Sequence, residues 1–549
     1  MSRAPVLVLG LDAADPVLVE RWIDAGHLPT LARLRAEGAY GRLTTFDYGR
    51  AESCNTTFLT GCGPATHGYW SPFKYADDYT VQAGAYDYAE FRPFYDLGPD
   101  YRVAVFDMPQ TRLIPGVNGV QVLGWGAHSP RCPSHSDPPD LFDDIVSTHG
   151  GHPTLHKDDV LSMGDAAAMQ RLFEGLETGV RRRVSACRDL LGRERWDLFL
   201  TYFSETHSAQ HYFWHTEHAD HPLYQTSDGP SPLLRIFQDV DRGIADLIDA
   251  APPGTRVIVF SDHGMETNST DVPSMVLLPE LMYRYSFPGQ FGLAKGKAGT
   301  APPPVVRMPR HRSWRSVLWG MKHDRNPITR WMRRTLPTTF FHYAIERRLG
   351  IADTVPLCPD DCRLGSQPPM WYHPAWPRMK AFALPSFSEG YVRVNVAGRD
   401  VQGIVDPADY DAVTGEITAE LEALRNPRTG SPAVARVVRT RRAALQESAP
   451  GERLPDADLI ILWTAEPTDV IDHPRFGRIG PVPFKRAGSH VHRGFLLAHG
   501  DGIPASRLTE HHALDLAPTI LTLLGAPLPA HFEGRPIAMD GRATATAAA

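Results

Sequence analysis

The chain has 549 residues, which is long enough for more than one compact unit. Of these residues 42% are hydrophobic and 22% charged, a composition that excludes a mainly disordered chain, a collagen-like repeat and a disulfide scaffold. Its formal net charge of −7 argues against a general nucleic-acid binder, and we expect no binding to a nucleic-acid duplex. The 24 histidines are more than a typical chain of this length carries, and histidine is the commonest metal ligand.

Short apolar runs alternate with helical patterns along much of the chain. Strands are expected at Val6–Leu11, Arg102–Phe106, Val120–Leu123, Asp197–Phe203, Arg256–Phe260, Leu459–Trp463 and Gly494–Ala498. Helices are expected at Pro16–Gly38, Gly164–Leu191 and Leu233–Ala250. This alternation predicts an α/β fold, a three-layer sandwich with a central, mainly parallel sheet.

The pattern breaks in the second half of the chain. Residues 285–380 are rich in proline, arginine and tryptophan, and an α+β piece follows up to residue 450, so we expect an inserted cap subdomain over 285–450. The core is then expected in two parts, 1–284 and 451–540, followed by a low-complexity, flexible tail over 541–549.

The segment 307–348 interleaves arginine with tryptophan. An amphipathic cap or an oligomer surface is favoured for it over a site for a polyanionic or aromatic substrate, and assembly into a homo-oligomer is left open.

The N-terminal residues run directly into the first apolar strand, without the longer apolar region and cleavage site of a signal peptide. No run of about 18 apolar residues occurs, so no membrane span is expected. The six cysteines are scattered, which is typical of a reduced protein. Together these features predict a cytoplasmic protein.

Three of the predicted strands end at polar clusters. Val6–Leu11 leads into Asp12, Asp197–Phe203 leads toward His207 and His211, and Arg256–Phe260 leads toward Asp262 and His263. Open α/β sheets bind ligands outside the carboxyl ends of their strands. Carboxylates and imidazoles together suit Zn²⁺ or another first-row divalent metal, so the pattern predicts a metal site at this edge.

Four stretches of sequence carry a resemblance to a known family. They read VLVLGLDAADPVLVERWIDAGHLPTLARLRAEGAYGRL; TTFLTGCGPATHGYW; ETHSAQHYFWH with VIVFSDHGM; and GSHVHRGFLLAHGDGI with LDLAPTILTLLGAPLPAHFEGRPI. In these stretches the chain resembles the alkaline phosphatase superfamily, in particular its type I phosphodiesterase/nucleotide pyrophosphatase family. The stretches come from both ends of the chain and skip the expected cap.

The resemblance implies a dinuclear metal-dependent hydrolase that acts on a small-molecule phosphodiester or related phosphoryl ester. Two adjacent divalent metals are implied, usually zinc, with iron or manganese as alternatives. Matched by motif, one metal would be held by Asp12, Asp262 and His263. The other would be held by His207, His211 and His490.

Two positions depart from the family pattern. The family usually has aspartate where this chain has His207, so the site loses a negative charge and should favour a more highly charged anion or a hydroxide. Counting back from Thr60-Gly61 places Ala51 at the position of the family's threonine or serine nucleophile, and alanine cannot attack phosphorus.

Nearby residues offer replacements for the missing nucleophile. Ser53 could attack, activated by metal coordination, or Glu52 could bridge the metals as a ligand while metal-bound hydroxide attacks. These two rank equally, and Cys54 as a thiolate ranks behind them. Asn55 is a weaker candidate for donating a hydrogen bond to a phosphate oxygen.

Three other functions stay open at this point. The same scaffold could hydrolyse sulfate or phosphonate esters. A bridging Glu52 with four histidines would resemble a non-haem di-iron site for oxidation. The loss of the nucleophile at Ala51 also allows a catalytically inactive metal- or ligand-binding protein.

Overall fold

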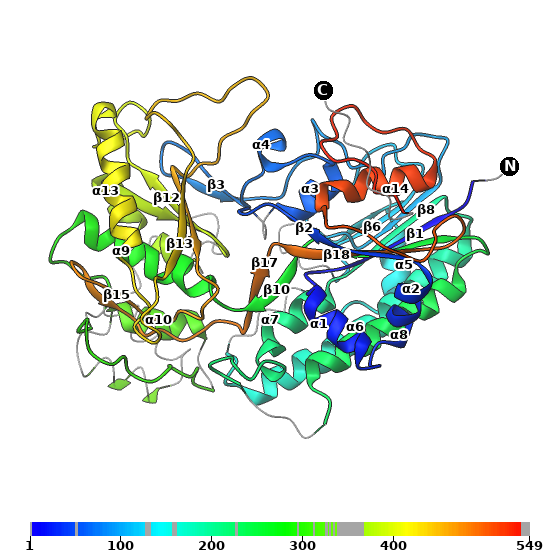
Figure 1. Ribbon diagram of the computed structural model, residues 1–549, viewed down its shortest axis with the longest axis horizontal. Coiled ribbons are helices and arrows are strands. Elements are labelled where there is room, and N and C mark those ends of the chain that lie inside the picture. The colour runs from blue at the N-terminus through cyan, green and yellow to red at the C-terminus, as the bar shows by residue number, and fades with distance from the viewer. Residues whose placement is uncertain are drawn as a thin grey trace.

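The computed structural model has two lobes, each built on its own β-sheet (Figure 1). The structure describes residues 3–49, 53–126, 133–155, 162–224, 229–293, 296–310, 313–323 and 367–539, together with Ile328, Trp331, Met332, Thr335 and Leu336. The predicted tail over 541–549 and most of the Arg- and Trp-rich segment after residue 323 lie outside this part of the chain.

The larger lobe contains a ten-stranded sheet. Its strands run in the order β19 (Ser506–Arg507), β2 (Ala39–Thr44), β18 (Arg493–His499), β9 (Arg256–Ser261), β1 (Val6–Leu11), β8 (Leu198–Phe203), β5 (Val103–Phe106), β6 (Gly119–Leu123) and β7 (His135–Asp137), and β20 (His511–His512) pairs with β2. The central strands β9, β1, β8, β5 and β6 are parallel, whereas β18 and β7 are antiparallel to their neighbours. The predicted α/β fold with a mainly parallel sheet is confirmed.

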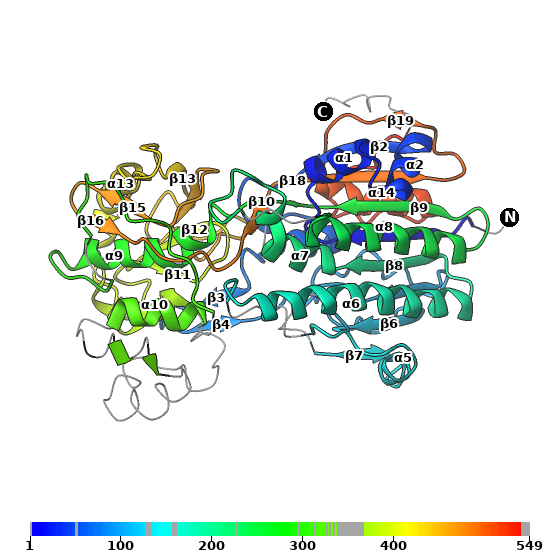
Figure 2. The same ribbon diagram turned by 90° about the horizontal axis from the view of Figure 1, so that it is seen from below.

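Helices cover both faces of this sheet because the side chains of β1 alternate between two hydrophobic clusters. Leu7, Leu9 and Leu11 pack in one cluster with α6 (Ala166–Arg193) and α8 (Pro232–Ala250), which run along one face in Figure 2. Val6 and Val8 pack in the other cluster with α3 (Cys54–Thr60) and α14 (Leu516–Leu524). A strand buried on both faces gives three layers.

The helix expected over Pro16–Gly38 is wrong as a single element. The chain forms α1 (Pro16–Asp24) and α2 (Pro29–Glu37), separated by a turn in which Gly26 has φ of 77°. Proline is well suited to the first turn of a helix but lacks the N–H needed in its interior, so Pro29 begins a new helix.

The smaller lobe contains a four-stranded antiparallel sheet. The strands run in the order β11 (Ala381–Leu384), β12 (Gly390–Val394), β14 (Leu459–Trp463) and β13 (Val434–Arg439). They pack in one hydrophobic cluster with helices from before and after residue 300: α9 (Leu278–Ser286), α10 (Trp314–His323), the 3₁₀ segment Pro368–Arg378 and α13 (Tyr410–Glu422).

The strand expected at Leu459–Trp463 is present, but it belongs to this smaller sheet. The domain division at residues 284, 450 and 540 stays a prediction. Because the cluster of the smaller lobe also includes Ile479 and Phe484, we propose a later end for the inserted unit, after Phe484.

Several short elements lie between the two lobes: α4 (Pro64–His67), β3 (Phe73–Tyr75), β4 (Val81–Ala83), α7 (Glu205–Phe213), β10 (Gly264–Thr267) and β17 (Gly488–Val491). In contrast, α5 (Leu141–His149) lies beside β7 in the larger lobe, and β15 (Ile471–His473) and β16 (Gly477–Ile479) belong to the smaller lobe. Within the described ranges, the helices are too short or too polar to cross a membrane.

Gly10 on β1 allows a close contact between two central strands. It pairs with Tyr202 of β8, and a Cβ at position 10 would lie 2.1 Å from Cδ2 of the buried Tyr202 ring. We expect Gly10→Ala to lower the free energy of unfolding by about 1–3 kcal/mol through overpacking, measured by urea unfolding. Gly192→Ala is the control, because a Cβ at that helical position meets no atom within 4 Å. It should not destabilise the chain, and equal losses in both variants would contradict the prediction.

Candidate metal centre

The order of the parallel strands brings the predicted ligands together. β9, β1 and β8 are neighbours in the sheet, and each leads at its carboxyl end into candidate ligands. Asp12 and His207 have 3% and 5% of their surface exposed, and His211, Asp262 and His263 have 2% or less. The polar residues therefore gather in a buried position at one edge of the sheet, as the strand-end pattern predicted.

His490 reaches this edge through a separate pair of short strands. β10 follows directly after His263 and pairs antiparallel with β17, and in this register Met265 lies opposite His490. The ring centroids of His263 and His490 are 4.8 Å apart. A residue from near the end of the chain thus lies beside residues that follow β9.

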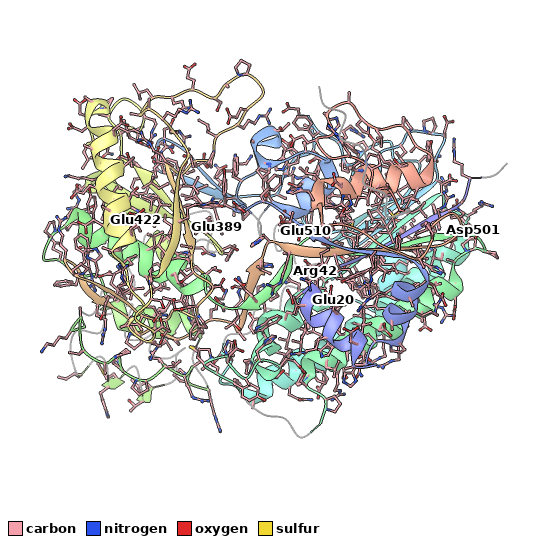
Figure 3. The ribbon with its side chains drawn as sticks, in the orientation of Figure 1. Glu20, Arg42, Glu389, Glu422, Asp501 and Glu510 are labelled. Carbon is pink, nitrogen blue, oxygen red and sulfur yellow. The ribbon has the colours of Figure 1, made fainter. Side chains whose placement is uncertain are left out.

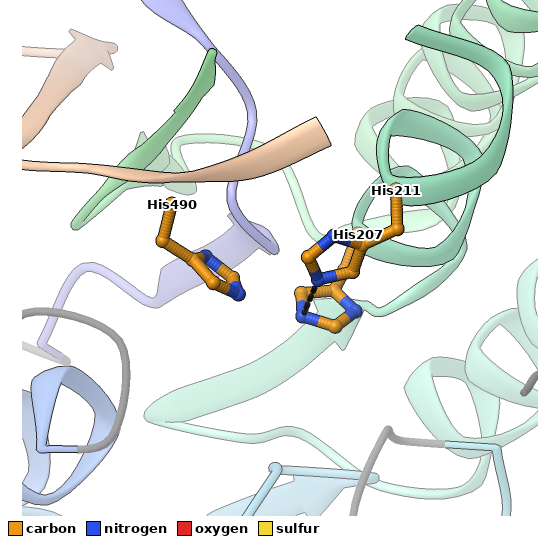
Figure 4. A group of neighbouring side chains, drawn as sticks. All are labelled: His207, His211 and His490. Carbon is orange, nitrogen blue, oxygen red and sulfur yellow. Dashed lines mark hydrogen bonds between the residues drawn. The ribbon is translucent and has the colours of Figure 1, made fainter. Parts of the chain in front are cut away.

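Three histidines form the first ligand group. His207 and His211 are one turn apart on α7, and with His490 they offer ring nitrogens that all lie within 4.8 Å of one another (Figure 4). The Nε2 atoms of His207 and His211 are 3.1 Å apart. Nδ1 of His211 lies 2.8 Å from the carbonyl oxygen of Gly488 and must donate to it, so Nε2 of His211 presents its lone pair.

Cys54, Asp262 and His263 form the second ligand group, again with ligand atoms within 4.8 Å of one another. Oδ1 of Asp262 accepts hydrogen bonds from Tyr202 Oη at 2.9 Å and His263 Nδ1 at 2.8 Å. Oδ2 of Asp262 is buried and has no hydrogen-bond partner among the described residues. Asp12 lies next to this group, with its Oδ1 3.9 Å from His263 Nε2.

These groups fit the metals that the sequence implies. A buried carboxylate oxygen without a donor is costly unless a cation or water satisfies it, and Asp262 Oδ2 is such an atom. Imidazole, carboxylate and thiol are the donors that zinc and similar divalent ions prefer. Tyr202 supports the arrangement, because burial and the neighbouring Asp262 raise its pKa well above the usual value and keep its hydroxyl a donor.

The nucleophile region is only partly described. Ser53 precedes α3, is fully buried, and donates its hydroxyl to the Gly49 carbonyl at 2.5 Å. Asn55 lies on α3, and its Oδ1 is buried without a hydrogen-bond partner in the described part of the chain. Ala51 and Glu52 lie outside the described residues, so their expected roles stay predictions. Cys54, which ranked behind Ser53 and Glu52 in the sequence, is the residue that the structure brings into a ligand group.

Sequence reasoning missed two contributors to this site. Tyr202 lies in an apolar strand, where only the register with its neighbours reveals that it reaches Asp262. Arg486 lies four residues before His490, and its Nη1 is 2.8 Å from Nε2 of His211. A single arginine near the ligands in space leaves no periodic signal in the sequence.

A third missed feature holds α7 from the other side. Glu205, at the start of α7, accepts hydrogen bonds from the buried Arg183, with Arg183 Nε 3.0 and 3.1 Å from its two oxygens, and its Oε1 is 3.1 Å from His152 Nε2. Burial alone would raise the pKa of Glu205, but Arg183 and His152 outweigh it and lower the pKa to about 2. Glu205 is therefore ionised at neutral pH and fixes the helix that carries His207 and His211.

The chain is similar to known proteins in the family model it matches and in two solved structures. The comparison with curated protein sequences gives no match. Two similar solved structures are phosphonoacetate hydrolase from Sinorhizobium meliloti 1021 in complex with phosphonoformate and the same enzyme in complex with phosphonoacetate, at 16% identity and TM-scores of 0.46 and 0.45, with 95% of this chain and 96% of that chain covered. Residues 6–291, just over half of the chain, match the family model described as type I phosphodiesterase / nucleotide pyrophosphatase. The chain therefore belongs to the type I phosphodiesterase / nucleotide pyrophosphatase family and is a metal-dependent phosphohydrolase, as its motifs predicted.

Proposed function

We propose that this protein is a dinuclear metal hydrolase that cleaves a small-molecule phosphoryl ester. The observation that carries the proposal is the pair of three-residue ligand groups, His207 with His211 and His490, and Cys54 with Asp262 and His263, which lie side by side at the carboxyl ends of parallel strands. Two divalent ions in such positions can clamp a phosphoryl group and stabilise both the attacking and the leaving oxygen.

Each ligand group is proposed to hold one metal, with zinc as the favoured ion. Asp12 is proposed as a further ligand to the group of Asp262 and His263, and Cys54 as a thiolate ligand of that same group. Glu52 is proposed as a ligand that bridges the two metals. A thiolate ligand suits zinc better than manganese or magnesium, which prefer oxygen ligands. This choice also makes the di-iron oxidation less favoured than phosphoryl transfer.

The surrounding residues are proposed to hold the ligands in the state that binding requires. The Gly488 carbonyl fixes the proton of His211 on Nδ1, and Tyr202 orients Asp262 through Oδ1 while leaving Oδ2 for a cation. His207 contributes a neutral imidazole where an aspartate would add a negative charge, so the metal and its ligands in this group carry a more positive net charge. Asn55 is proposed to donate to a phosphoryl oxygen.

The attacking group is proposed to be Ser53 or a water molecule. In the structure the Ser53 hydroxyl donates to a backbone carbonyl, which is too weak a base to take its proton. Ser53→Ala separates the two cases, because loss of turnover with intact metal content assigns the attack to Ser53. Retained turnover assigns it to water.

Metal analysis combined with turnover tests the proposed function. Protein purified without added metal should contain about two zinc ions per chain, hydrolyse bis(p-nitrophenyl) phosphate or p-nitrophenyl phosphate, lose this activity with a chelator, and regain it with zinc. A sulfate ester and a phosphonate ester in the same assay test the variant chemistries.

The other outcomes would each contradict the proposal. Iron in place of zinc, without hydrolysis of any of these esters, would favour the oxidation chemistry. Bound zinc with no turnover of any of them would favour an inactive binding protein.

A further inference from the structure

A buried arginine is held at the edge of the three-histidine group. Arg486 has 8% of its surface exposed, and its Nη1 lies 2.8 Å from Nε2 of His211. Its Nε and Nη2 donate to Oδ2 and Oδ1 of Asp271 at 2.5 and 3.1 Å. The guanidinium is thus fixed by a two-pronged ion pair on one side and faces a candidate metal ligand on the other.

The partner carboxylate is itself fixed. Asp271 is 1% exposed, its Oδ2 accepts from Asn268 Nδ2 at 3.0 Å, and its backbone N–H donates to Asn268 Oδ1 at 3.2 Å. The ring of Phe387, from the smaller lobe, lies 5.9 Å from Arg486 Cζ. Glu389, two residues further on, lies on the side of the smaller lobe that faces the larger one, whereas Glu422 lies further out (Figure 3). Both lobes therefore contribute to the position of Arg486.

The hydrogen bond between Arg486 and His211 cannot persist when His211 binds a metal. Because Nδ1 of His211 donates to the Gly488 carbonyl, Nε2 is the only ring nitrogen that can act as a ligand, and it has a single lone pair. A metal ion and the Nη1–H of Arg486 compete for that lone pair. Once the metal takes it, this N–H is still directed at the metal-binding edge of His211, because Asp271 holds the rest of the guanidinium in place.

We propose that Arg486 is a specificity-determining residue that donates Nη1–H to an oxygen of the phosphoryl group and selects a doubly charged one. The three ligands at this edge are neutral imidazoles, and the charge of Asp271 is balanced by Arg486. A second negative charge on the substrate is therefore stabilised here. The preferred substrate class is a phosphate monoester or a terminal phosphonate, ahead of a singly charged diester. This inference rests on the proposed function.

Inhibition by inorganic phosphate and paired substrates test this inference. We expect Arg486→Gln to weaken competitive inhibition by inorganic phosphate roughly 10- to 100-fold, the range that follows from losing a hydrogen bond to a charged group. It should lower kcat/KM for p-nitrophenyl phosphate by a similar factor and lower that for bis(p-nitrophenyl) phosphate less. Arg428→Gln is the matched control, because Arg428 makes a two-pronged pair with Asp469 in the smaller lobe, and it should leave both ratios unchanged.

Two further measurements distinguish phosphoryl binding by Arg486 from a purely structural role of this residue, and a third outcome tests the proposed function itself. The zinc content of Arg486→Gln should stay at the wild-type level, and a loss of zinc together with equal losses for both substrates would overturn the inference in favour of a role in holding His211. In the unmodified protein, inorganic phosphate should inhibit more strongly than dimethyl phosphate, and the reverse order would overturn the inference even if no variant folds. A wild-type protein without any turnover would instead contradict the proposed function.

Discussion

Asp262→Asn is expected to lower the metal content from about two ions to one per chain and to reduce kcat/KM for phosphoryl ester hydrolysis by about 10³-fold or more. A metal ion in a site of this kind contributes several kcal/mol of transition-state stabilisation, and each 1.36 kcal/mol is a factor of about ten in rate. The amide has nearly the shape of the carboxylate and can still accept from Tyr202, so the folded structure should persist. What it lacks is the negative charge on the buried oxygen that has no donor in the described part of the structure.

Asp241→Asn is the matched control for this experiment. Asp241 is also a buried aspartate of the larger lobe, but its two oxygens accept from the backbone N–H groups of Thr30 and Leu31 at 3.0 and 2.8 Å and touch neither ligand group. Its replacement should cost some stability and leave metal content and kcat/KM within about twofold of the wild-type values. Elemental analysis and steady-state kinetics measure both variants. If Asp262→Asn keeps two metals and full activity, the assignment of Asp262 as a ligand is wrong.

Local patterns of apolar and polar residues in the sequence predict part of the site. A buried parallel strand such as Val6–Leu11 shows as a continuous apolar run, and the residue after it lies at the edge of the sheet where ligands bind. The spacing of His207 and His211 fits one turn of a helix. His490 was expected to join them because of a motif resemblance, and the pairing of β17 with β10 is the physical means by which it does.

The parts that escaped prediction depend on contacts between distant segments. Leu459–Trp463 has the composition of any buried strand, and only its pairing with β12 and β13 assigns it to the smaller sheet. In the sequence Arg486 looks like any surface arginine. In the structure it lies 2.5 Å from Asp271, which is 215 residues away in the sequence. The sequence alone presents Cys54 only as a weak candidate nucleophile, whereas its position next to Asp262 and His263 favours metal ligation.

The ion pairs beneath α7 give the second large prediction. Arg183 is fully buried, and its Nη2 lies 2.8 Å from Asp107 Oδ2 while its Nε donates to Glu205. Removing one partner of a buried ion pair leaves an uncompensated charge, which costs about 3–5 kcal/mol. Arg183→Met keeps much of the volume and removes the charge, so we expect a loss of that size in the free energy of unfolding of the metal-free protein, measured by urea unfolding.

Arg193→Met provides the comparison within the same helix, because Arg193 pairs with Asp189 and Asp144 while its side chain is 36% exposed. Exposed pairs contribute about 0–1 kcal/mol, so this variant should unfold at nearly the wild-type urea concentration.

The two buried carboxylates that Arg183 leaves behind also predict a pH effect. Protonation of Glu205, whose folded-state pKa is about 2 with Arg183 present, should occur at higher pH in Arg183→Met, because the cation that lowers this pKa is gone. The stability that Glu205 contributes is present above its unfolded-state pKa and is lost as the pH falls through its folded-state pKa. The difference in stability between wild type and Arg183→Met should therefore shrink as the pH falls from neutral toward 2. A difference that stays constant over that range would mean that Arg183 stabilises the protein by packing rather than by charge.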